Sequence, residues 1–189
     1  PSHWEDICER AALRRAYVIK REDIPAELIV NSDQMGVVGN PGAKLTWAPR
    51  GSLQVAVIGA DEKRTFTTLL AISLSGKLLP GQAVYVGATN ASCPSSTAPK
   101  YKECAAAGFR HLPSKTGNHR ANLGTMQDFV IHILNPYFEE EKKRLGLPPD
   151  QKSLWILDVW SVQRSKAWRD WMHTNYPNIM LDFIPGGCT

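Results

Sequence analysis

The stretch that decides the fold is LWILDVWSVQRSKAWRDWMHTNYPNIMLDFI, residues 154–184. It opens with an apolar run of strand length, residues 154–159, and closes with another, residues 179–184. The segment between the two runs carries its large apolar residues on one face of a helix, namely Trp168, Trp171 and Met172. A strand, a covering helix and a second strand in this order predict two parallel neighbours in one sheet.

Upstream of this stretch, short β-forming runs follow one another with tight connections. Residues 28–33 form an apolar run that ends in an acid, which predicts a buried strand with Asp33 at its carboxyl end. Further runs rich in β-formers are residues 53–60, 65–74 and 83–86, the first two joined by a hairpin-like connection at 61–64. We therefore predict an α/β fold in which an antiparallel meander and then parallel strands form one mixed sheet flanked by helices.

The clearest helical pattern lies between the meander and the parallel strands. From Leu123 to Phe138, apolar residues recur every three or four positions, which is typical of a helix with one buried stripe. Pro136 is expected to kink this helix or to start a second piece. Residues 89–103 are rich in Ser, Thr and Pro, and they predict a loop or insertion.

The composition fits one globular domain. The 189 residues are 43% hydrophobic and 21% charged, which suffices for a sizeable core and excludes collagen, coiled coils and wholesale disorder. No apolar run is long enough to span a membrane and the first residues are polar, so we expect a soluble, intracellular protein without a membrane partner. We assign residues 1–23 to a lead-in helix or linker and residues 24–189 to the domain, and we expect the chain to be a fragment of a longer protein.

The basic charge is concentrated in one part of the chain. Residues 40–120 hold 10 Lys and Arg against 3 Asp and Glu, whereas the whole chain has a net charge of only +4. Such a basic segment can neutralise the phosphates of a nucleic acid. A solvated face of lysines and arginines explains the same pattern, and charge alone does not separate the two interpretations.

Two acids occupy equivalent positions in the predicted sheet. Asp33 ends one buried run and Asp158 lies within another, where an unpaired carboxylate is costly. Each acid by itself could cap a turn or pair with a basic residue. If the two strands are neighbours, however, the carboxylates repel each other when ionised, and a divalent cation relieves the repulsion. Oxygen ligands favour magnesium or manganese over zinc.

Four motifs, in this order, resemble the catalytic domain of pogo-like DDE transposases, especially the fungal transposon-derived type. They are NSDQMG at 31–36, TWAPRG at 46–51, LDVWS at 157–161 and PGGCT at 185–189. The resemblance covers most of the chain and implies a ribonuclease-H-like fold with DNA as the partner. It also implies a nuclear location, and homo-oligomers are possible. Asp33 and Asp158 match the first two acids of the catalytic and metal-binding triad.

The resemblance further implies the chemistry. Two Mg²⁺ or Mn²⁺ ions held by the acids would drive DNA cleavage and strand transfer by in-line attack at phosphorus, with Asp33 bridging both ions and Asp158 holding one. The third acid of the family lies beyond the Gly-Cys-Thr segment, and Asp182 comes before that segment, so we do not assign it this role. The domain is then incomplete at its carboxyl-terminal end, and the fragment is expected to be inactive alone.

Candidate phosphate contacts are Lys44, Arg50 and Arg120, although surface solubility explains each of them equally well. Three departures from the family pattern, namely Gln34, Val159 and Gln163, favour an alternative function. In that alternative, the chain is a domesticated, catalytically inactive nucleic-acid-binding module. A third interpretation is a protein-interaction domain whose acids are structural. Metal affinity and salt-sensitive DNA binding distinguish the three.

Overall fold

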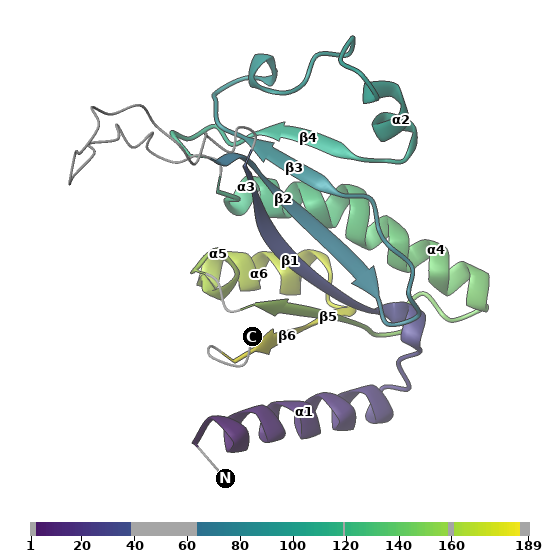
Figure 1. Cartoon of the computed structure of the whole chain (residues 1–189). Helices are drawn as coiled ribbons and strands as arrows, with labels where there is room; N and C mark the ends of the chain where they lie inside the picture. The colour runs from purple at the N-terminus through teal and green to yellow at the C-terminus, as the bar shows by residue number, and fades with distance from the viewer. Residues whose placement is uncertain (1–2, 39–63, 119, 159–160, 186–189) are drawn as a thin grey trace, which may run out of the picture.

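The structure is a computed structural model that describes residues 3–38, 64–118, 120–158 and 161–185 (Figure 1). The helical elements are α1 (His3–Arg21), η1 (Ala26–Leu28), η2 (Asn90–Ser92), α2 (Tyr101–Ala106), α3 (Leu123–Phe129), η3 (Val130–Leu134), α4 (Asn135–Leu145), α5 (Ser161–Arg164) and α6 (Lys166–Asn175). The strands are β1 (Ile29–Val38), β2 (Arg64–Ser73), β3 (Gln82–Tyr85), β4 (Arg110–Pro113), β5 (Ser153–Asp158) and β6 (Ile179–Ile184). The strand predicted at 53–60 lies outside the described residues.

The strands form one mixed sheet in the order β4-β3-β2-β1-β5-β6. β2 is antiparallel to both β1 and β3, whereas β5 is parallel to both β1 and β6. The first strand therefore lies inside the sheet, between an antiparallel neighbour on one side and the parallel pair on the other. This arrangement confirms the predicted mixed sheet flanked by helices, and the strands of Asp33 and Asp158 are adjacent in it.

The β3–β4 region differs from the prediction. β4 is parallel to β3, and the intervening segment, predicted as a loop, contains the short helices η2 and α2. β4 is the four-residue stretch RHLP, which is too short to show an alternating pattern. Its strand conformation depends on pairing with β3, and pairing between separated segments leaves no periodicity in the sequence.

Helices cover one face of the sheet and bury its aromatic core. Trp155 of β5 is fully buried there, between Phe129 of α3 and Trp168 of α6, with ring centroids 5.8 and 6.0 Å away. Ser32 of β1 lies in the same layer, and its Oγ accepts a 2.8 Å hydrogen bond from Trp155 Nε1. Residues 30, 32 and 34 of β1 thus point toward the helices, and residues 31, 33 and 35 point away.

The long helical segment has the predicted break. Asn122 caps α3 by accepting a hydrogen bond from Thr125 N, and Thr125 Oγ1 accepts one from Asn122 N. The π-helical η3 then leads into α4, where Pro136 lies in the first turn and its missing N–H costs no hydrogen bond. Gly146 ends α4 in the left-handed conformation, with φ of 67°.

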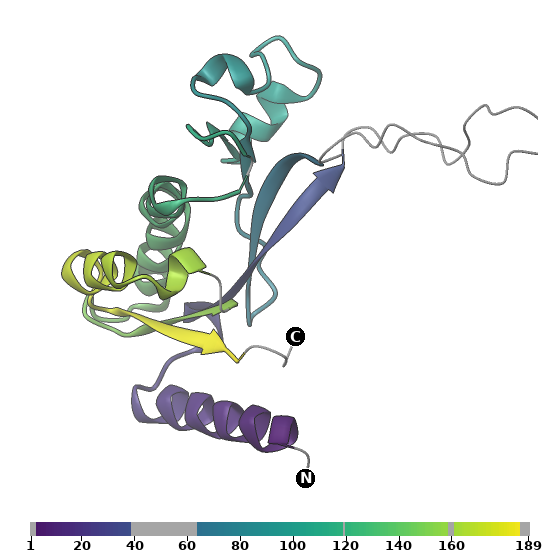
Figure 2. The same ribbon diagram turned by 90° about the vertical axis from the view of Figure 1, so that its left-hand side faces the viewer.

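Helix α1 runs alongside β6 at the end of the sheet, apart from α3, α4 and α6 (Figures 1 and 2). Val18 and Ile19 pack against the core from this side. Within the described part of the chain, no helix combines the length and the apolar character needed to cross a membrane.

Candidate metal centre

The register between β1 and β5 brings Asp33 and Asp158 together. The two strands are parallel, and their last paired residues are Ser32 and Leu157, so the next residue on each strand is one of the two acids. Neighbouring strands lie about 4.8 Å apart. Ser32 and Leu157 are buried under the helices, and the alternation of side chains therefore places both acids on the opposite face. Both acidic residues are exposed.

The backbone around each acid is held by a neighbouring strand. Asp33 pairs with Leu70 of β2, and its Oδ1 accepts a 2.7 Å hydrogen bond from the backbone N–H of Gln34. Asp158 is the last residue of β5 and pairs with Ile184 of β6. Two strands inside a sheet fix the separation of their side chains more firmly than loops do. Exposure to water keeps the cost of two adjacent negative charges low.

This pair of acids lies near the edge where the parallel strands end. β1, β3, β4, β5 and β6 run in the same direction, so the connections that follow them emerge at one edge of the sheet. Arg120 is exposed in the connection after β4, and its backbone N–H donates to Asn118 Oδ1 over 3.0 Å. The connection that contains Arg120 therefore starts at the same edge of the sheet at which β5 ends with Asp158. Lys44 and Arg50 lie outside the described residues.

The donor set fits a hard divalent cation. Magnesium keeps several water ligands and is commonly held by one or two carboxylates together with substrate phosphates. Two exposed carboxylates on adjacent strands match this requirement, whereas a zinc site would need histidine or cysteine ligands. Among the described residues, no group of three His, Cys, Asp or Glu side chains could hold a metal ion. The described donor set is therefore the two aspartates.

Asp182 lies on the same face of the sheet as Asp33 and Asp158, but its carboxylate is paired with two arginines. It pairs with Ile156 on β5, two residues before Asp158, and its side chain is only 8% exposed. Arg14 Nη2 donates to its Oδ1 over 2.6 Å, and Arg15 Nε donates to its Oδ2 over 2.5 Å. Both carboxylate oxygens of Asp182 therefore accept hydrogen bonds from arginines.

No pattern in the sequence predicts the contact of the two arginines with Asp182. Their partner Asp182 lies 167 and 168 positions away in the chain, a separation at which no local pattern predicts a contact. The only signal in the sequence is the composition of α1: from Arg10 onward, this helix contains basic residues and no acid.

Gln34, one of the departures from the family pattern, points away from the acids. Its Nε2 lies 3.8 Å from Met126 Sδ, under the helices, whereas Asp33 is on the opposite face. A carboxylate at position 34 would therefore face the core rather than the candidate metal centre. The side chains of Val159 and Gln163 lie outside the described residues.

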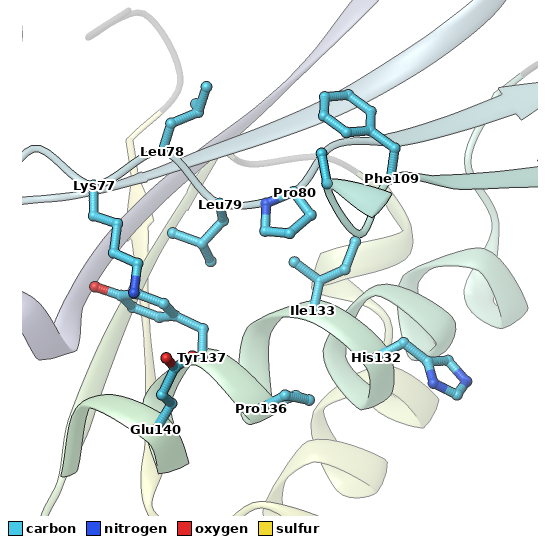
Figure 3. A pocket seen from close by; sticks show the side chains of 11 residues that line it. Lys77, Leu78, Leu79, Pro80, Phe109, His132, Ile133, Pro136, Tyr137 and Glu140 are labelled. Carbon is cyan, nitrogen blue, oxygen red and sulfur yellow. The ribbon is translucent and has the colours of Figure 1, made fainter. Parts of the chain in front are cut away.

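A separate cavity of about 470 Å³ lies between the segment that joins β2 to β3 and the η3–α4 helix (Figure 3). Leu79, Ile133 and Pro136 line it, with Lys77 and Glu140 at its rim. The β2–β3 connection is at the opposite edge of the sheet from the ends of β1 and β5.

Comparisons with known proteins give structural neighbours only. No protein-family model and no curated protein matches the chain. The Mos1 mariner paired-end complex with Mn is similar, with a TM-score of 0.49 and 12% identity over 96% of this chain and 43% of that one. A pre-cleavage Mos1 transpososome has a TM-score of 0.48 and 13% identity over 94% of this chain and 43% of that one. The chain thus spans less than half the length of these structures, which are similar to it at low sequence identity.

Proposed function

We propose that this chain is the metal-binding core of a transposase-derived, DNA-processing domain in which Asp33 and Asp158 hold divalent cations. The observation that carries the proposal is the pair of exposed carboxylates that directly follow the last paired residues of the adjacent parallel strands β1 and β5. Two exposed carboxylates on adjacent strands are suited to a hard divalent cation. The four sequence motifs add the pogo-like DDE resemblance, with Mg²⁺ or Mn²⁺ as cofactor, DNA as substrate and the nucleus as location.

In this mechanism, Asp33 and Asp158 would hold the cations and orient them toward the DNA. Asp33 extends from a strand with a neighbour on each side, which fixes the position of its backbone. Asp158 presents a second carboxylate from the neighbouring strand. Because both side chains are exposed, a DNA phosphate can approach them without a conformational change. When bound, divalent ions activate the attacking oxygen and stabilise the leaving oxygen of an in-line displacement at phosphorus.

Calorimetric titration with Mn²⁺ tests the proposal. We expect binding to the wild-type chain and loss of that binding in both Asp33→Asn and Asp158→Asn, since each variant removes one charge of the pair. Asp170→Asn is the matched control, because Asp170 is an exposed aspartate on α6 that pairs with Lys166. It should bind Mn²⁺ like the wild type. Binding that survives both substitutions, or no binding to the wild-type chain, contradicts the proposal.

The alternative function is a nucleic-acid-binding module without catalysis. It requires salt-sensitive DNA binding, but it does not require Asp33 or Asp158. Gln34 is one of the departures that favour this alternative. It faces the core and not the two acids, so it carries little weight as a sign of lost metal binding. DNA binding that is unchanged by Mn²⁺ and by both aspartate substitutions would favour the module over the nuclease.

A further inference from the structure

On the face that carries the acids, two arginines share one carboxylate. Arg14 and Arg15 of α1 each donate to a different oxygen of Asp182, over 2.6 and 2.5 Å. The Asp182 side chain is 8% exposed, whereas that of Arg14 is 60% exposed and that of Arg15 is 27% exposed. We name these three residues the Arg14–Arg15–Asp182 cluster. A buried carboxylate thus holds two guanidinium groups that still reach solvent.

The charges of this cluster do not balance. One carboxylate neutralises only one of the two guanidinium charges, so the cluster keeps a net positive charge. Each guanidinium has several N–H donors in a planar fork, and its hydrogen bond to Asp182 uses one of them. Further along α1, Lys20 adds another basic side chain, whereas Arg21 pairs with Glu22 directly after the helix over 2.6 Å. The remaining donors are suited to an anion that accepts several hydrogen bonds at once.

The cluster is close to the candidate metal centre. Asp182 pairs with Ile156, two residues before Asp158 on β5, and the rise per residue puts it about 7 Å along the strand direction from the two acids. A cavity of about 470 Å³ opens between α1 and the sheet at this point, and Arg14, Arg15 and Asp182 line it together with apolar residues such as Val18 and Met180. A strand of DNA with one phosphate at the acids has further phosphates within reach of this cavity.

We propose that Arg14 and Arg15 form a binding site for the phosphodiester backbone of DNA, with Asp182 orienting the two guanidinium groups. The inference rests on the proposed function, and it assigns α1 a direct part in substrate binding. A guanidinium pairs with a phosphate through two parallel hydrogen bonds, which a lysine cannot make. Holding both groups on a buried carboxylate lowers the entropy lost when they bind the phosphate.

Salt-dependent DNA binding tests this site. The wild-type chain, Arg14→Gln and Arg14→Lys are titrated into a fluorescein-labelled duplex of about 30 base pairs at several salt concentrations, and anisotropy is recorded. We expect Arg14→Gln to bind several-fold more weakly and to reduce the slope of log K against log salt by about 1, as for one lost phosphate contact. Arg14→Lys should keep the slope but bind more weakly, because it keeps the charge and loses the planar fork.

Arg169→Gln is the matched control, since Arg169 is an exposed arginine of α6, which packs on the opposite face of the sheet. It should bind DNA like the wild type. If Arg14→Gln and Arg169→Gln have the same affinity and slope, the site is refuted while the proposed function stands. If the wild-type chain does not bind the duplex at all, DNA processing and this site fail together. Circular dichroism of each variant confirms that exposed residue 14 tolerates the change.

Discussion

At the residue scale, one buried hydrogen bond ties together the two strands that carry the acids. Ser32 directly precedes Asp33, and its Oγ accepts from Trp155 Nε1 over 2.8 Å in the layer beneath the helices. Both side chains are buried, Ser32 at 5% and Trp155 at 0% exposure. The bond satisfies the indole N–H, which would otherwise be unpaired in an apolar core.

We predict that Ser32→Ala lowers the free energy of unfolding by about 1–3 kcal/mol, because it leaves the buried Trp155 N–H without an acceptor. Urea denaturation measures the change. Ser32→Thr retains the hydroxyl and a β-branched side chain suited to a strand, and it should lose much less. Equal stability of Ser32→Ala and the wild type would mean that the indole finds another acceptor.

At the scale of elements, α4 is tied to the β2–β3 connection through a buried acid. The Glu141 side chain is 2% exposed and accepts from Lys77 Nζ over 2.8 Å and from Arg144 Nε over 2.7 Å. The hydrogen bond from Lys77 lowers the pKa of Glu141 below its usual value of 4.5, and the bond from Arg144 adds to the effect. Lys77 also lies over the ring of Tyr137, 5.2 Å from its centroid.

The pH dependence follows from the direction of this shift. A lowered pKa in the folded state means that Glu141 stabilises the fold above pH 4.5, and that this stability is lost as the pH falls through the folded-state pKa. We predict that Glu141→Gln is less stable than the wild type at pH 7 and that the difference shrinks below pH 4.5. Thermal unfolding at several pH values measures it. A difference that stays constant down to acidic pH would refute this account.

At the scale of the whole molecule, α1 is joined to the last strand of the sheet. The Arg14–Arg15–Asp182 cluster links the first helix to β6, and Val18 packs into the same region. Removing one partner of a buried ion pair leaves the other charges uncompensated. We therefore expect Asp182 to help hold α1 against the sheet.

We predict that Asp182→Asn increases amide hydrogen exchange in α1 by several-fold, whereas β1 and β5 keep their protection. Local opening of one element with an intact core has this signature. Hydrogen exchange with mass spectrometry measures it, and Asp170→Asn on α6 is the control that removes an exposed aspartate instead. Equal exchange of α1 in both variants would show that apolar packing alone holds the helix.

Local patterns in the sequence predicted the elements with strong periodicity. The two apolar runs, residues 154–159 and 179–184, correspond to β5 and β6 in the structure. The helix predicted between them from Trp168, Trp171 and Met172 corresponds to α6. The position of Asp33 and Asp158 on two strands was likewise predictable, because an acid in an apolar run stands out. The short β4 was missed, as were the helices of the β3–β4 connection.

The sequence by itself determined most of the strands and helices, which of their faces are apolar, and that Asp33 and Asp158 each lie in or at the end of an apolar run. That the two strands are neighbours was implied only by the family resemblance. Only the tertiary structure decided the register that puts Asp33 beside Asp158 and the parallel pairing of β4 with β3. The same holds for the hydrogen bonds of Arg14 and Arg15 to Asp182. The physical reason is the separation along the chain of the residues that interact. Periodicity reflects the burial of side chains within one element, whereas register and ion pairs join residues that are far apart in the chain and meet only after packing.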